Sequence, residues 1–125
     1  MAEQNYTGKE GEEEARNYLI SQGYTIYNTN WRWKHYEIDI VAAKDGELAI
    51  VEVKTRTDDP LLSPEEAIDQ AKIKRLVSAA DVYARRFRIE MPVRFDIITL
   101  LKDENGGYEI DHLEDAFYAP LRSRR

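Results

Sequence analysis

Two segments of the sequence repeat apolar residues at the spacing of an α-helix. The first covers residues 8–22 and ends at Gly23, a residue that commonly terminates helices. The second begins at residues 63–66, Ser-Pro-Glu-Glu, which supply a capping serine and a proline at the first helical position. We expect it to continue to residue 87 and to bury a stripe made of Ile73, Leu76, Val77, Ala80, Tyr83, Ala84 and Phe87.

Five further segments are rich in β-branched and aromatic residues and predict strands. Their expected bounds are residues 24–28, 36–44, 47–54, 92–101 and 108–112. Residues 30–34 are predicted to be a polar and aromatic connection, and residues 105–107 a turn. The predicted order is therefore helix, three strands, helix and two strands, an α/β arrangement.

The dipeptide Asp45-Gly46 is typical of a tight hairpin, and it determines the register of the two strands that flank it. Counting outward from a two-residue turn places Asp39 opposite Glu52, and Glu37 opposite Lys54. Alternation puts these four side chains on one face of the hairpin. The apolar residues of that face are Val41 and Ile50. The opposite face is the expected core face, and it carries Ile38, Ile40, Ala42, Ala49, Val51 and Val53.

The charged face of the hairpin favours metal chemistry. Carboxylates placed directly opposite each other repel, and a divalent cation would remove that penalty. Two or three carboxylates form the oxygen-rich set that Mg²⁺ or Mn²⁺ prefers. Lys54 lies two residues beyond Glu52 on the same face, where an amine can hold or deprotonate an attacking water or contact a phosphate oxygen. The alternative is an ordinary solvent-facing hairpin with a Glu37–Lys54 ion pair.

Composition limits the class of protein. A chain of 125 residues with 42% hydrophobic positions fits one domain spanning residues 1–125, with a core of about residues 8–118 and a basic tail at residues 119–125. Cysteine is absent, which excludes disulfides, thiolate nucleophiles and cysteine zinc sites. We find no apolar run of membrane-spanning length and no apolar segment of a signal peptide, so we expect a cytoplasmic protein without a membrane partner.

The net charge of −6 speaks against non-specific binding to nucleic acid, but the charge is unevenly distributed. Residues 72–94 contain seven Lys or Arg and two Asp or Glu, a local net charge of +5. This segment is a candidate phosphate-facing surface. A solvated helix face is the alternative interpretation.

Asp39 followed by Glu52-Val53-Lys54 on the next strand, together with a helical glutamate, resembles the divided active site of the PD-(D/E)XK nuclease superfamily. Across residues 8–100 the sequence also looks like the UPF0102, or YraN-type, family. The motifs that carry this resemblance are Gly8, Gly11-Glu12, Asn30-Trp31-Arg32, Glu37-Ile38-Asp39, Val51-Glu52-Val53-Lys54-Thr55-Arg56, Pro64-Glu65-Glu66-Ala67, Lys72 and Arg94-Phe95-Asp96. The resemblance implies a restriction-endonuclease-like fold, with a mixed central sheet flanked by helices, and similarity to archaeal Holliday-junction resolvases.

The resemblance also implies roles for individual residues. Asp39 and Glu52 match the metal-binding carboxylates, Lys54 matches the catalytic lysine, and Glu12 matches the helical glutamate that completes the metal site. A helical wheel alone does not choose between Glu12 and Glu14. Glu37 and Lys72 match positions near the site and are assigned supporting roles. The implied cofactor is Mg²⁺ or Mn²⁺.

The function implied is a divalent-metal-dependent endonuclease that hydrolyses the phosphodiester bonds of DNA, branched or junction DNA included, in a chain that could form a homodimer. The alternatives are a non-catalytic nucleic-acid-binding module on the same scaffold and a protein-interaction domain. Trp31 and Trp33 could stack on unpaired bases, although a place in the core is the more common role. His35 is expected to be polar surface, and His112 is assigned no role. The residues expected to contact nucleic acid are Arg32, Lys34, Arg56, Lys74, Arg75 and Arg94.

Overall fold

The computed structural model describes residues 2–56 and 70–117 and shows a five-stranded mixed sheet with two helices. The predicted order of elements and the α/β class are confirmed. Within the described ranges, neither helix is long and apolar enough to cross a membrane. The elements are α1 (Ala2–Ser21), β1 (Thr25–Trp33), β2 (Tyr36–Lys44), β3 (Glu47–Arg56), α2 (Gln70–Arg86), β4 (Val93–Lys102) and β5 (Tyr108–Phe117).

Several boundaries differ from those predicted. The helix α1 begins six residues earlier than expected, and β1 continues through the predicted connection to Trp33. The strand β5 extends to Phe117. The two strands lengthen because each pairs along its length with a neighbour, β1 with β2 and β5 with β4, and such pairing is invisible to local sequence patterns. The predicted helix start at residues 63–66 and the basic tail at residues 119–125 lie outside the described residues.

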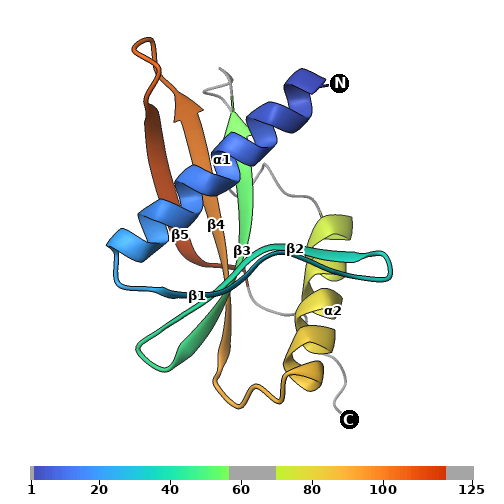
Figure 1. Ribbon diagram of the computed structural model, residues 1–125. Helices are drawn as coiled ribbons and strands as arrows, with labels where there is room; N and C mark the ends of the chain where they lie inside the picture. Colours follow the sequence, from blue (N-terminus) through green and yellow to red (C-terminus); the bar gives the residue numbers. More distant parts are fainter. Residues whose placement is uncertain (1, 57–69, 118–125) are drawn as a thin grey trace.

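The strands follow one another across the sheet in the order β1-β2-β3-β4-β5. All neighbours are antiparallel except β3 and β4, which are parallel and are connected by the segment that contains α2. Parallel neighbours require such a crossover connection. The helix α1 lies across one face of the sheet, and α2 covers the other face beside β2 (Figure 1).

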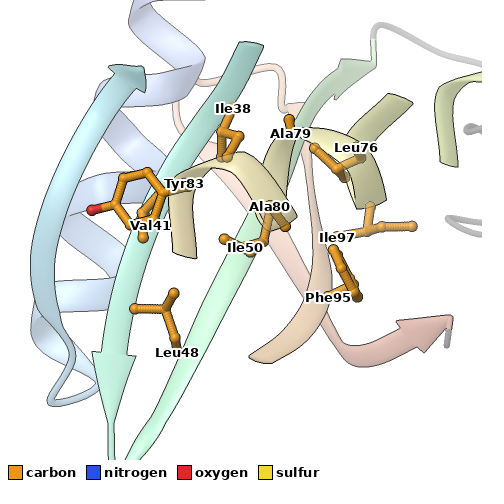
Figure 2. Close-up of a cluster of buried hydrophobic side chains, with 10 residues drawn as sticks. All are labelled: Ile38, Val41, Leu48, Ile50, Leu76, Ala79, Ala80, Tyr83, Phe95 and Ile97. Carbon is orange, nitrogen blue, oxygen red and sulfur yellow. The ribbon is translucent and has the colours of Figure 1, made fainter. Parts of the chain in front are cut away.

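Both faces of the β2–β3 hairpin are therefore core, which corrects the expectation that one face is polar. Val41 and Ile50 lie under α2, in a cluster with Leu76 and Tyr83 (Figure 2). Ile40, Ala42, Ala49 and Val51 pack under α1 with Leu19, as predicted. Ile38 joins the α2 cluster instead of the α1 cluster, because β2 turns away from β3 beyond Ile40 and the simple alternation ends there.

Candidate active site

The predicted site lies where β2 separates from β3. The two strands pair from Lys44↔Glu47 to Ile40↔Val51, which is the register counted from the sequence. The ladder ends there, so the expected pairs of Asp39 with Glu52 and of Glu37 with Lys54 do not form. Figure 1 shows β2 turning toward α2 while β3 continues straight.

The Asp39 side chain takes the place of the next ladder hydrogen bond. Its Oδ2 atom accepts a hydrogen bond from the backbone N–H of Val53 at 2.8 Å. This contact satisfies an amide that the departing strand would leave unpaired. It also fixes the Asp39 carboxylate beside residue 52 of β3.

Glu52 is buried, with 4% of the residue exposed, and a lysine of α2 neutralises it. The Lys72 Nζ atom lies 2.9 Å from Glu52 Oε2. Burial alone would lower the pKa of Lys72, but the hydrogen bond to Glu52 and the charges of Glu52, Asp39 and Glu37 raise it above its ordinary value. The ammonium group therefore stays charged, and the structure brings Lys72 into the carboxylate cluster.

Among the residues that the structure describes, none places a cation as close to Asp39, the second carboxylate of the pair, as Lys72 is to Glu52. Burial, followed by repulsion from Glu52, raises the pKa of Asp39 from 3.8 to about 7, although the Val53 amide and Lys72 act in the opposite direction. Near neutral pH the group is therefore divided between its neutral and charged forms. A cation next to Asp39 would favour the charged form of its carboxylate and lower its pKa.

The first helix approaches this cluster closely because residue 11 is glycine. A Cβ atom on Gly11 would overlap with Oγ1 of Thr55 on β3. The next residue, Glu12, is half-buried, and burial together with the charges of Glu37 and Glu52 raises its pKa, although a hydrogen bond with Asn30 lowers it. Glu14 is exposed and lies toward Tyr108 of β5. The structure thus places Glu12, rather than Glu14, near the hairpin carboxylates.

An open cavity of about 160 Å³ lies between the end of the hairpin and α2. It is lined by Glu37, Asp39, Glu52 and Lys72 of the predicted catalytic and supporting residues, and by Arg75 of the predicted nucleic-acid contacts. The other described residues that line it are His35, Tyr36 and Leu76. The sequence analysis assigned no site role to His35 or Tyr36. Their position directly before Glu37 is the feature of the sequence that could have indicated a place in the site.

Two predicted site residues do not line this cavity. Glu12 approaches from α1, as described above. Lys54 is half-buried on β3, two residues after Glu52. Because the side chain of Thr55 contacts α1, alternation places Lys54 on the same side of β3 as Glu52.

The predicted nucleic-acid contacts fall into different environments. Arg32 and Glu37, both exposed, form a long ion pair of 3.5 Å, a kind that contributes little to stability. Lys74 and Arg75 are exposed on α2, and Lys34 is exposed near the end of the β1–β2 hairpin. The side chain of Arg56 lies outside the described part of the chain.

Arg94 differs from the other predicted contact residues because its guanidinium group is engaged inside the protein. Only 13% of its side chain is exposed, and it donates to Asp96 at 2.9 Å, to Glu47 at 3.0 Å and to Tyr24. Hydrogen bonding to Asp96 raises the pKa of Arg94 further. These contacts give Arg94 a structural role, and its predicted contact with nucleic acid stays a prediction.

His112 belongs to the same network, which sequence reasoning did not find. Its Nε2 atom lies 2.7 Å from Asp96 Oδ2, and its Nδ1 atom lies 3.2 Å from the Tyr18 hydroxyl. Burial would raise the pKa of Asp96, but hydrogen bonds from His112, Arg94 and the Asp115 amide lower it below its ordinary value. The network joins α1, β4 and β5. The charged residues at 94 and 96, on a mostly apolar strand, are the feature of the sequence that could have indicated a buried polar network.

Comparison with known proteins agrees with the family resemblance of the sequence motifs. The model of the family described as "Uncharacterised protein family UPF0102" matches residues 11–100. The chain belongs to the UPF0102 family. A UPF0102 protein of Parabacteroides distasonis is 62% identical over 98% of this chain and 100% of its own length. UPF0102 proteins of Bacteroides thetaiotaomicron and Flavobacterium psychrophilum are 57% and 44% identical over 97% and 94% of this chain, and over 99% and 98% of their own lengths.

The part matched by the UPF0102 model begins within α1 and ends within β4, and it contains α2 and the β2–β3 hairpin in full. It includes Glu12, Asp39, Glu52, Lys54 and Lys72. The strand β5, with His112, lies beyond it. The carboxylate cluster thus lies entirely within the region that defines the family.

Proposed function

We propose that this UPF0102 protein is a divalent-metal-dependent endonuclease that hydrolyses phosphodiester bonds of DNA, including branched DNA. One observation carries the proposal. Asp39 and Glu52 are held together at an open cavity, and Lys72 forms a close ion pair with only one of them. A pair of buried carboxylates in a cleft, one of them with a raised pKa as in Asp39, is typical of functional sites, since stability alone does not favour it.

The available donors suit Mg²⁺ or Mn²⁺. Both are hard cations that bind carboxylate oxygens and retain several waters, so two protein ligands are enough. Among the described residues, no three Asp, Glu or His side chains form a ready group of ligands. We therefore assign Asp39 and Glu52 as the protein ligands, with Glu12 as a nearby third carboxylate. A bound ion would polarise the phosphate and acidify a water molecule.

The other residues of the site have distinct roles in this proposal. Lys72 holds Glu52 in place through their 2.9 Å ion pair. Lys54 lies on the same side of β3 and can orient the attacking water or a phosphate oxygen. Arg75 is exposed at the cavity and can bind a phosphate. A cytoplasmic location forms part of the proposal, as expected from the sequence.

A cleavage assay tests this function. End-labelled linear duplex, single-stranded, nicked and four-way-junction DNA are incubated with Mg²⁺, with Mn²⁺ or with EDTA. The proteins compared are the wild type, Asp39→Asn and the control Asp81→Asn, which changes an exposed aspartate of α2 outside the site. We expect metal-dependent cleavage of at least one substrate by the wild type and the control, and a loss of about a hundredfold or more in Asp39→Asn.

Two results would contradict the proposal. One is a failure of the wild type to cleave any of these substrates with either metal. The other is equal cleavage by the wild type and Asp39→Asn, since that activity would arise elsewhere. DNA binding that depends on salt but is unchanged by metal and by Asp39→Asn, with no cleavage, would indicate the non-catalytic alternative instead.

A further inference from the structure

The end of the β1–β2 hairpin carries three aromatic rings next to the carboxylate cavity. Trp33, the last residue of β1, pairs with Tyr36, the first residue of β2. Their rings are nearly parallel, with an angle of 4° and centroids 6.5 Å apart. The exposed ring of His35 lies 4.3 Å from that of Tyr36. We call Trp33, His35 and Tyr36 the hairpin shelf.

The apolar core accounts for the position of Trp31 but not for that of Trp33. Trp31 packs edge-on against Tyr83, with centroids 5.2 Å apart, and belongs to the apolar cluster under α2. Trp33 is half-buried and, within the part of the chain that the structure describes, does not pack against either core cluster. The second tryptophan is thus available for contacts outside the molecule.

Cations lie over the Trp33 ring. The Lys34 Nζ atom is 4.7 Å from its centroid, and the Arg86 guanidinium carbon is 5.4 Å from it. Both side chains are exposed, and they belong to different elements, since Arg86 ends α2. Two positive charges at one aromatic ring attract phosphate groups, while the ring itself can stack on a nucleobase.

Two of the three shelf residues reach the cavity of the carboxylates, and the Trp33 ring is stacked on one of them, Tyr36. His35 and Tyr36 line the cavity together with Asp39 and Glu52. A base stacked on the shelf would therefore have its backbone close to the carboxylates. Bases within a continuous duplex are stacked on each other and do not offer a free face, whereas flaps, loops and single-stranded ends do.

We infer that the hairpin shelf stacks on an unpaired base next to the bond to be cleaved, so that the substrates carry a single-stranded segment beside the scissile phosphodiester. This inference rests on the proposed nuclease function and specifies the substrate class of the same site. Lys34 and Arg86 bind the phosphates that flank the stacked base. Duplex DNA without unpaired bases lacks this contact.

Binding can be measured separately from cleavage. Fluorescence anisotropy with Ca²⁺ in place of Mg²⁺ gives the affinity for a labelled single strand, for a duplex with a single-stranded flap and for a blunt duplex. The variants are Trp33→Leu and the control Tyr27→Leu, which removes an exposed aromatic ring from the same strand outside the shelf. We expect Trp33→Leu to weaken binding of the single strand and flap by about five- to a hundredfold. Blunt-duplex binding and the control should change by less than about twofold.

A second measurement detects stacking directly and keeps Trp33 in place. The chain has two tryptophans, so Trp31→Phe leaves Trp33 as the single indole reporter. Its emission should be quenched by the single strand and not by the blunt duplex. Equal affinities of the wild type and Trp33→Leu for the flap, an equal loss in Tyr27→Leu, or unchanged emission would overturn the inference. Absence of cleavage with Trp33-dependent binding retained would overturn the nuclease function alone.

Discussion

The raised pKa of Asp39 predicts that the metal-free protein loses stability as pH rises. In the unfolded chain the group ionises near 3.8, whereas in the folded chain burial and Glu52 raise its pKa to about 7. Below about pH 4 the group is neutral in both states. Between about pH 4 and 7 only the unfolded state releases the proton, so each increase in pH favours unfolding. Above about pH 7 the full penalty is present.

The size of this effect follows from the two pKa values. At about 1.4 kcal/mol per pKa unit, the difference between 3.8 and about 7 corresponds to roughly 4 kcal/mol of unfolding free energy at most. The substitution Asp39→Asn removes the titrating group and keeps an oxygen that can accept the hydrogen bond from Val53. The variant should therefore gain stability relative to the wild type between pH 4.5 and pH 8.

Urea unfolding followed by circular dichroism, with EDTA present, measures this gain at several pH values. Comparing the variant with the wild type at each pH cancels the contributions of titrating groups that do not interact with residue 39. The control Asp81→Asn, an exposed residue, should show a constant difference. If the difference in unfolding free energy between Asp39→Asn and the wild type is constant from pH 4.5 to pH 8, or changes in the opposite direction, the pKa of Asp39 is not raised in the folded protein.

Substitutions at four further positions test other parts of the structure. Gly11→Ala should destabilise the protein by about 1 to 3 kcal/mol in urea unfolding, because the new methyl group overlaps with Thr55, and Thr55→Ala in the same chain should restore most of the loss. Lys72→Met should cost roughly 2 kcal/mol, since it leaves a buried carboxylate without its cation, and Lys72→Arg should cost less. Arg75→Ala should weaken DNA binding and reduce the slope of log affinity against log salt concentration by about the amount of one phosphate contact. Arg94→Ala should instead lower the free energy of unfolding, because it removes the hydrogen bonds to Asp96.

The local parts of the fold could be predicted from the sequence. The turn at residues 45–46 determined the hairpin register by counting, and the apolar stripe of α2 identified its buried face. The length of β1 could not be predicted, because residues 30–33 become a strand only by pairing with β2. Nor could the place of Ile38, since it depends on how β2 turns away from β3.

In the candidate site, too, the local features could be predicted and the contacts between distant elements could not. Asp39 and Glu52 could be brought together from the hairpin alone. The ion pair between Lys72 and Glu52 requires the position of α2 over the sheet, which no local pattern contains. The contact between His112 and Asp96 requires the register of β5 against β4. Contacts between elements far apart in the chain thus could not be predicted from local sequence patterns.

We propose that Asp39 and Glu52 together hold a divalent cation, and calorimetric titration measures this binding without a substrate. Mn²⁺ is titrated at pH 8 into the wild type, Asp39→Asn and the control Asp81→Asn, without any nucleic acid. We expect saturable binding by the wild type and the control, and a loss of affinity of about tenfold or more in Asp39→Asn. Equal binding by all three proteins, or no binding by the wild type at millimolar metal, would contradict the claim.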